Sequence, residues 1–120
     1  MSAQTYQGGC QCGAVRYEVT TDLDRTFSCN CSRCGRLGTI LSFTPKTNFS
    51  LLSGADSLTL YQFNTKIIQH QFCKVCGVES FASGQFKRGG GVEMVAVNAR
   101  CLDGVEPDQL APTKIDGRSF

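Results

Sequence analysis

Residues 8–19 read GGCQCGAVRYEV and residues 72–77 read FCKVCG, and each stretch places a pair of Cys beside a strand-forming segment. In short Cys turns of this kind two sulfurs can point at one centre, while nearby backbone N–H groups donate to the thiolates. Two pairs from distant segments make a closed tetrahedral site, and its metal ties the segments together. The pattern predicts a structural zinc site with four ligands, Cys10, Cys12, Cys73 and Cys76.

A third group of Cys lies between these pairs, in the stretch SCNCSRCG at 28–35. It offers three thiolates, one ligand short of a closed tetrahedron. Structural zinc sites fill four positions with protein ligands, whereas catalytic zinc sites keep one position for water or substrate. We therefore predict a second, open and catalytic zinc site on Cys29, Cys31 and Cys34, which brings the expected content to two zinc ions per chain. A thiol substrate in the open position would react as a thiolate at neutral pH.

Residues next to these Cys groups carry further predictions. Gly35 and Gly77 directly follow the last Cys of their groups, where we expect a positive φ. Arg33, Arg36 and Lys74 could offset the negative charge of the thiolates or bind a substrate carboxylate, and ordinary surface charge is an equal alternative.

Other uses of the eight Cys stay open at this point. They could form disulfides or hold an iron–sulfur cluster, although the spacing matches neither ferredoxin pattern. A third alternative makes both metals structural, with His70 or Cys101 closing the second site. We expect His70 to be a buried, hydrogen-bonded side chain instead, and Cys101 to pack as a small apolar residue.

Size and composition narrow the class of protein. The 120 residues are predicted to form one domain, 1–120, with no linker. A hydrophobic fraction of 41% and a charged fraction of 18% are typical of a globular protein, and a net charge of +2 argues against a nucleic-acid partner. We find no secretory signal and no membrane-spanning stretch, so we expect a cytosolic location, where clustered thiols bind metal more often than they form disulfides.

The remaining sequence predicts a mainly β fold with tight turns and short helical segments. Alternating residues indicate strands at 15–19, 40–44, 58–63, 67–72, 80–83 and 92–97. A hairpin tip is expected at Asn64 and Thr65, and another at the Gly-rich stretch 89–91. One short helix is predicted at 32–37, with Ser32 as its N-cap, and the chain from Asp103 onward is expected to be extended or looped.

In this order the motifs, C-x-C-G before a strand, then C-x-C-x-x-C, then F-C-x-x-C-G, resemble the glutathione-dependent formaldehyde-activating enzyme family, also called the centromere-protein-V/GFA (CENP-V/GFA) domain. The stretches VAVNARCLDG at 95–104 and KIDGRS at 114–119 also resemble motifs of this family and occur in the same order. The resemblance implies a zinc-stapled β-tent of small coiled antiparallel sheets. It also implies a structural zinc on the outer four Cys and a catalytic zinc on the central three.

The resemblance further implies a carbon–sulfur lyase that joins glutathione, as co-substrate, and formaldehyde to S-(hydroxymethyl)glutathione, or makes a related thiol–aldehyde adduct. Asn30 could assist as a donor beside the metal, or simply form a turn. The alternatives are a non-catalytic zinc-binding thiol carrier and a protein-interaction module. After Cys76 this chain reads GVESFAS at 77–83, where relatives often place a His or a Thr.

Overall fold

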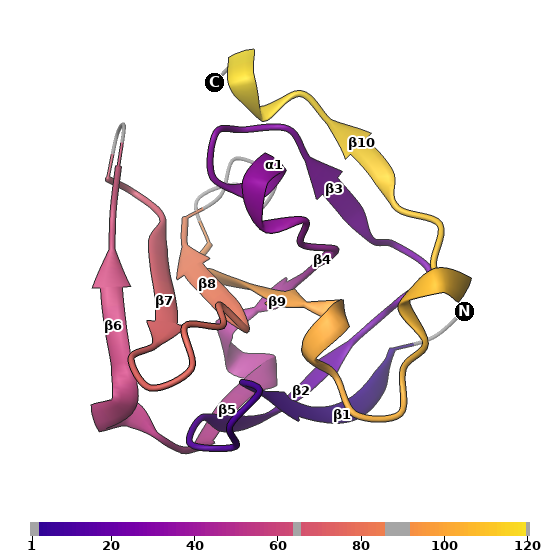
Figure 1. Cartoon of the computed structure of the whole chain (residues 1–120). Coiled ribbons are helices and arrows are strands. Elements are labelled where there is room, and N and C mark those ends of the chain that lie inside the picture. Colours follow the sequence, from indigo (N-terminus) through magenta and orange to yellow (C-terminus); the bar gives the residue numbers. More distant parts are fainter. Residues whose placement is uncertain (1–2, 64–65, 86–91, 120) are drawn as a thin grey trace.

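Two β-sheets make up most of the structure (Figure 1). The computed structural model describes residues 3–63, 66–85 and 92–119. The smaller sheet has the strand order β1-β2-β5 and the larger sheet the order β10-β3-β4-β9-β8-β7-β6. The strands are β1 (Gln4–Gly9), β2 (Arg16–Thr21), β3 (Phe27–Cys29), β4 (Leu41–Pro45), β5 (Phe49–Ser53), β6 (Leu58–Tyr61), β7 (Gln69–Cys73), β8 (Phe81–Gly84), β9 (Met94–Asn98) and β10 (Thr113–Ile115). The predicted fold class, a mainly β-tent of small sheets with short helical turns, is confirmed.

The alternation of apolar and polar residues in β2 gives this strand one buried face. Tyr17 and Val19 are fully buried, whereas Glu18 between them is exposed. The predicted strand at 15–19 is therefore confirmed, with bounds that lie slightly later. Strand β2 pairs antiparallel with both β1 and β5.

The predicted hairpin of 58–63 and 67–72 forms as the antiparallel pair β6 and β7, with Leu58 opposite Cys73. Its expected tip at Asn64 and Thr65 lies outside the described residues, and so does the Gly-rich stretch 89–91. The strands expected at 40–44 and 80–83 are present as β4 and β8, each displaced by one residue.

Strand β9 departs from the half-buried alternation that its sequence predicts. Val95, Ala96 and Val97 are all buried, on both faces of the strand. The reason is its position, because β9 is hydrogen-bonded between β4 and β8 inside the larger sheet. Elements that pack over both faces of the sheet leave no solvent-facing side there.

An aromatic cluster joins the two sheets. The rings of Tyr17 and Phe49 from the smaller sheet contact Phe81 of β8, with ring centroids 4.8 to 5.7 Å apart. The Tyr17 hydroxyl donates to the carbonyl oxygen of Ser80 over 2.9 Å, so its polar end is satisfied inside the core. Burial of each such side chain stabilises the fold by about 1.5–3 kcal/mol. The cluster fixes β2 and β5 of the smaller sheet relative to β8 of the larger sheet.

The described helical segments are short. They are α1 (Cys34–Leu37) and the 3-10 turns η1 (Lys46–Asn48), η2 (Ala55–Ser57), η4 (Ala99–Cys101), η5 (Pro107–Gln109) and η6 (Gly117–Ser119). The prediction that Ser32 caps the helix is wrong, because the N-cap residue is Arg33 and no side-chain oxygen bonds there. The backbone N–H of Cys34 instead donates to the sulfur of Cys31 over 3.2 Å. A Cys sulfur therefore takes the place of a polar cap.

The chain after Asp103 is looped, as expected, and it also adds an edge strand to the larger sheet. Strand β10 pairs parallel with β3, with Ile115 opposite Cys29. Every other strand pair of the described residues is antiparallel. The C-terminal segment therefore lies beside β3, the strand that ends at Cys29 (Figure 1).

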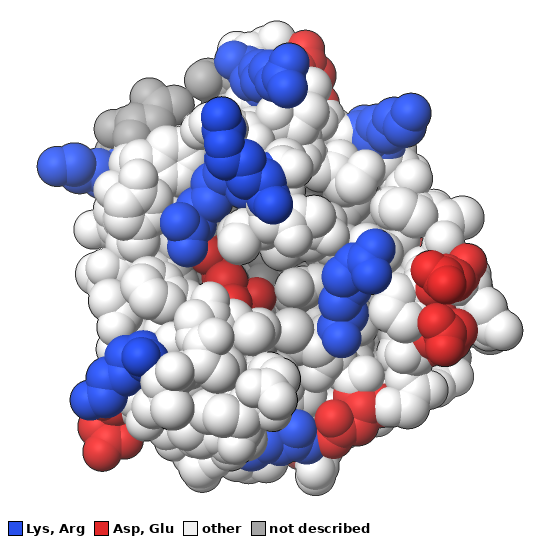
Figure 2. Space-filling model, viewed as in Figure 1, with Lys and Arg blue, Asp and Glu red and all other residues white. Residues whose placement is uncertain are grey.

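Charged side chains are spread over the face seen in Figure 2, with several Lys and Arg side chains grouped where Figure 1 places α1. Within the described ranges, no helix has the length and apolar character needed to cross a membrane.

Candidate metal centres

The outer four Cys meet at one point. The sulfurs of Cys10 and Cys12, from the β1–β2 loop, and of Cys73 and Cys76, from the turn after β7, all lie within 4.8 Å of one another. The sulfur of Cys12 is 3.6 Å from that of Cys10 and 3.7 Å from that of Cys73. A tetrahedron with Zn–S bonds of about 2.3 Å has edges of about 3.8 Å. The donor set therefore fits a zinc ion, and these separations are far longer than an S–S bond.

Backbone groups support this four-sulfur cluster. The N–H of Val15 donates to the sulfur of Cys10 over 3.3 Å, and the N–H of Val75 donates to that of Cys73 over 3.4 Å. A hydrogen bond from the backbone N–H of Val78 is the main cause that lowers the pKa of Cys76 to about 6. Such donors favour thiolates, which are the form that binds metal.

The turn that delivers Cys76 closes as the sequence predicts. Gly77 has a φ of +81°, and its N–H donates to the carbonyl oxygen of Cys73 over 2.7 Å. The matching expectation for Gly35 is wrong, because this residue lies inside α1 and its N–H donates to the carbonyl oxygen of Cys31. The two Cys turns therefore continue differently, one into a loop and the other into a helix.

The central three Cys also come together. The sulfurs of Cys29 at the end of β3, Cys31 in the following loop and Cys34 at the start of α1 lie within 4.8 Å of one another. Cys34 is buried, whereas Cys29 and Cys31 are half-buried. The pKa values of Cys29 and Cys34 are raised, chiefly by burial. Three partly buried thiolates need a compensating cation, and soft sulfur donors suit zinc.

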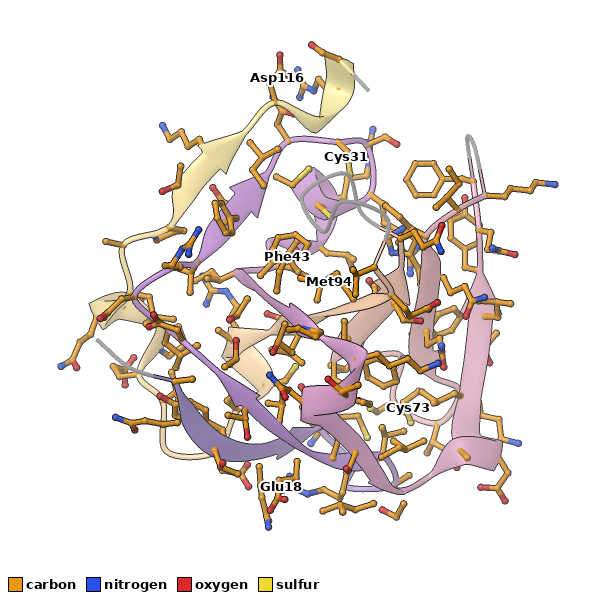
Figure 3. The ribbon with its side chains drawn as sticks, turned by 180° about the vertical axis from the view of Figure 1, so that it is seen from behind. Glu18, Cys31, Phe43, Cys73, Met94 and Asp116 are labelled. Atoms are coloured by element: carbon orange, nitrogen blue, oxygen red, sulfur yellow. The ribbon has the colours of Figure 1, made fainter. Side chains whose placement is uncertain are left out.

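No fourth His, Cys, Asp or Glu of the described residues joins this three-sulfur cluster. Cys101 lies in η4, outside both clusters, and burial raises the pKa of its thiol to about 11. All eight Cys are within the described ranges and all are free thiols. The two clusters could hold metal ions, and they lie in different parts of the molecule, as the positions of Cys31 and Cys73 in Figure 3 show.

Asn30 ties the C-terminal segment to the three-sulfur cluster. Its backbone N–H donates to the carbonyl oxygen of Ile115 over 3.2 Å, and its side-chain amide donates to Asp116 over 3.0 Å. Its two oxygens accept from Arg118, the side-chain oxygen from the backbone N–H and the carbonyl oxygen from Nε. The side chain of Asn30 is therefore engaged in holding residues 115–118, rather than free to assist a reaction.

Gly117 brings this segment into direct contact with the cluster. A Cβ atom at this position would lie 2.3 Å from the sulfur of Cys29 and 3.1 Å from the Cβ of Cys31. No side chain larger than hydrogen fits there unless the cluster or the segment moves. The C-terminal segment is consequently one wall of the three-sulfur cluster.

Residues of this wall line two hollows. The larger has a volume of about 550 Å³ and is lined by Cys31, Ser32, Gly35, Arg36 and Arg118. The smaller has a volume of about 280 Å³ and is lined by Ser28, Cys29, Asn30, Lys114, Ile115 and Asp116. The larger falls within the size range of small-molecule sites.

The family described as "Glutathione-dependent formaldehyde-activating enzyme" (GFA) matches residues 5–116, which include both Cys clusters. This chain belongs to the GFA family. The resemblance seen in the sequence motifs is confirmed.

Two individual proteins are similar to this GFA-family chain. A Podospora anserina protein whose name refers to glutathione-dependent formaldehyde activation is 27% identical over 88 residues, which are 66% of this chain and 41% of that protein. This chain thus spans about two fifths of the length of the curated relative. The crystal structure of a Rhodobacter sphaeroides protein is 34% identical, with a TM-score of 0.80 over 90% of this chain and 97% of the other.

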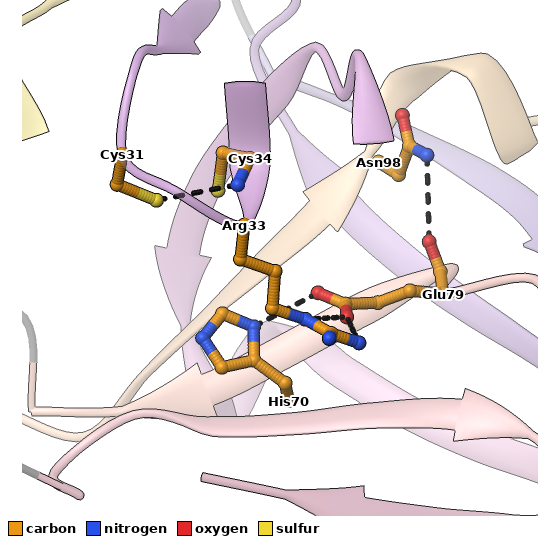
Figure 4. A network of polar contacts seen from close by, with 6 residues as sticks. All are labelled: Cys31, Arg33, Cys34, His70, Glu79 and Asn98. Atoms are coloured by element: carbon orange, nitrogen blue, oxygen red, sulfur yellow. Dashed lines mark hydrogen bonds and ion pairs between the residues drawn. The ribbon is translucent and has the colours of Figure 1, made fainter. Parts of the chain in front are cut away.

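A buried ion-pair network in this GFA-family protein was not foreseen from the sequence (Figure 4). Arg33, between Cys31 and Cys34, donates through Nε and Nη2 to one carboxylate oxygen of Glu79 over 2.9 and 2.7 Å. The other oxygen of Glu79 lies 3.0 Å from Nδ1 of His70, which confirms His70 as a buried, hydrogen-bonded side chain.

This network assigns roles to the basic residues that flank the clusters. The guanidinium of Arg33 is paired with Glu79 and lies 4.7 Å from the ring centre of Tyr61, so it anchors the loop of the three-sulfur cluster to β6 and to the segment between β7 and β8. The only signal in the sequence was a charged residue in the GVESFAS stretch, just ahead of a buried strand. Lys74 is exposed, and Arg36 lines the larger hollow.

Proposed function

We propose that this GFA-family protein is a zinc-dependent enzyme that joins glutathione and formaldehyde to S-(hydroxymethyl)glutathione, or forms a related thiol–aldehyde adduct. Formally this is a carbon–sulfur lyase reaction that runs in the direction of adduct formation. The observation that carries the proposal is the contrast between the two clusters, since one has four sulfurs and the other has three beside a hollow of about 550 Å³. Family membership supports the same activity.

The proposal gives each cluster a different role. Cys10, Cys12, Cys73 and Cys76 would hold a structural zinc that ties the β1–β2 loop to the turn after β7. Cys29, Cys31 and Cys34 would hold a catalytic zinc. When bound there, zinc supplies an open ligand position that favours the thiolate form of a substrate thiol near neutral pH.

The overall reaction conserves all atoms of both substrates. A bond forms between the thiol sulfur and the carbon of formaldehyde, the C=O double bond becomes a single bond, and the thiol proton ends on the resulting hydroxyl oxygen. The protein contributes by holding the thiol in the hollow beside Cys31, so that the reacting atoms meet in one orientation. The hydrogen bond from the N–H of Cys34 keeps Cys31 oriented toward the cluster.

A kinetic experiment tests the activity. Formation of S-(hydroxymethyl)glutathione is followed by NMR exchange spectroscopy with zinc-loaded protein, with Cys31→Ser and with Cys101→Ser, the matched control outside both clusters. We expect acceleration above the uncatalysed rate by the wild type and by Cys101→Ser, and none by Cys31→Ser. Glutathione binding without acceleration would make the protein a thiol carrier, and neither property would leave an interaction module, so both results contradict the enzyme proposal.

We also place this activity in the cytosol. The two clusters consist of unpaired thiols. Thiols persist in this form in a reducing compartment, which supports the location.

A further inference from the structure

We propose that Arg36 and Arg118 bind a carboxylate of the thiol substrate, so that the site selects thiols carrying a carboxylate over neutral thiols. The inference rests on the proposed function and assigns substrate selection to two residues of the larger hollow. Glutathione, with its two carboxylates, is a thiol of this class.

The two guanidinium groups come from different parts of the chain to the same hollow. Arg36 belongs to α1 and Arg118 to η6, and both line the space of about 550 Å³ that also borders Cys31. A substrate whose sulfur is directed at the three-sulfur cluster would therefore place the rest of its body between them. Figure 2 shows basic side chains gathered on the face where Figure 1 places α1.

Each guanidinium is oriented by one backbone contact. Nη1 of Arg36 donates to the carbonyl oxygen of Ser32 over 2.9 Å, and Nε of Arg118 donates to that of Asn30 over 2.9 Å. A guanidinium has five N–H donors, so each side chain keeps donors for a ligand. The planar fork of Arg matches the geometry of a carboxylate and can bond to it through two parallel hydrogen bonds.

Neither of these two cations, Arg36 and Arg118, forms a salt bridge within the part of the chain that the structure describes. Arg33 in the same region, by contrast, is paired with Glu79. The nearby carboxylate of Asp116 lines the other hollow, and its pKa is lowered by hydrogen bonds from Ser119 and Asn30 and, to a smaller extent, by the charge of Arg118. A carboxylate ligand in the larger hollow would therefore give each guanidinium a direct charged hydrogen-bond acceptor.

The test compares thiols that differ in charge. KM and kcat are measured for glutathione, for its diethyl ester, which lacks both carboxylates and keeps the amino group, and for the neutral thiol 2-mercaptoethanol, with zinc-loaded wild type, Arg36→Gln and Arg118→Gln. Lys46→Gln, an exposed cation in η1 that lines neither hollow, is the matched control. Arg118→Lys keeps the positive charge but lacks the planar guanidinium that can form two parallel hydrogen bonds. The zinc content of every variant is measured to verify that the three-sulfur cluster is intact.

We expect KM for glutathione to rise about tenfold in Arg36→Gln and in Arg118→Gln, as the loss of one charge-assisted contact implies, and to rise less in Arg118→Lys. The KM values for the ester and for 2-mercaptoethanol should not rise in these variants, and all values for Lys46→Gln should stay unchanged. An equal rise in KM for thiols with and without a carboxylate, or no effect on glutathione, would overturn the inference while the activity itself stands.

A wild type without activity toward any thiol would refute the proposed function separately. The inference then rests on calorimetric binding of glutathione and its diethyl ester to the zinc-loaded protein. Tighter binding of glutathione than of its diethyl ester by the wild type, and loss of this difference in Arg36→Gln and Arg118→Gln, would support the inference. Equal binding of the two compounds, or no binding, contradicts it.

Discussion

Replacement of Glu79 by Gln should weaken both the fold and the three-sulfur cluster. The Glu79 side chain is 6% exposed and pairs with Arg33, which is 21% exposed, and with His70, which is 6% exposed. Glutamine keeps the size of the side chain but removes its charge, so Arg33 loses its counter-ion and the contact of His70 with a carboxylate oxygen is lost. Loss of one member of a buried ion pair costs about 3–5 kcal/mol. Arg33 is partly hydrated and stacks on Tyr61, so we expect a loss of about 2–3 kcal/mol.

For a protein of this size that loss corresponds to a fall in Tm of about 8–12 °C, measured by scanning calorimetry of the zinc-loaded protein. Glu18→Gln is the matched control, because Glu18 is exposed on β2 and its replacement should change stability by about 0.5 kcal/mol or less. A Tm for Glu79→Gln equal to that of Glu18→Gln would refute the reasoning.

Glu79→Gln should also weaken zinc binding by the three-sulfur cluster. Arg33 lies between two residues of the three-sulfur cluster and is held by Glu79, so we expect zinc affinity there to fall about tenfold, with the four-sulfur cluster unaffected. A double-mutant cycle with Arg33→Gln isolates the pair, and we expect a coupling free energy of about 1–3 kcal/mol. Strict additivity would show that Glu79 acts on the fold by another route.

Two further predictions concern contacts of the C-terminal half. Gly117→Ala places a Cβ 2.3 Å from the sulfur of Cys29. A chelator should therefore remove zinc from the three-sulfur cluster of this variant at a chelator concentration about tenfold lower than for the wild type. Gly35→Ala is the control and should behave as wild type, because its Cβ has no contact closer than 3.5 Å. The Arg16 guanidinium lowers the pKa of Asp103 below 3.8, so this ionised carboxylate stabilises the fold at neutral pH and the contribution is lost as pH falls below that value. Urea unfolding should therefore show Asp103→Asn slightly less stable than wild type at pH 7 and equal to it in strong acid, and a difference that persists in acid would contradict this assignment.

The Cys groups could be predicted because their chemistry is local. Spacing within each group brings sulfurs together in a turn, and the metal requirement of four ligands pairs the two outer groups. The strand at β2 and the hairpin of β6 and β7 were equally predictable, because a half-buried strand must alternate. In these segments the local sequence pattern alone predicts the structure.

The remaining parts depend on contacts between distant segments. Strands β3 and β10 have three residues each, too few for any periodicity, and they pair across more than eighty positions of sequence. Strand β1 was missed because its residues QTYQGG are mostly polar, so it is held by backbone pairing with β2. Strand β5 was also not foreseen.

The residues that surround the three-sulfur cluster could not be predicted from the sequence for the same reason. The bonds of Asn30 to Asp116 and Arg118 join residues 86 and 88 positions apart, and the pair of Arg33 with Glu79 spans 46 positions. Composition and spacing identify the sulfur ligands of such a site. They do not identify the residues that orient those ligands or line the approach to them.

The zinc content per chain, determined by elemental analysis for the wild type and for Cys31→Ser, tests the central claim most directly, with glutathione binding followed by calorimetry on both proteins. The account predicts two zinc ions in the wild type, one in Cys31→Ser, and loss of the glutathione signal together with the second ion. One zinc ion or none in the wild type, or glutathione binding that survives the substitution, would contradict an open catalytic site on Cys29, Cys31 and Cys34.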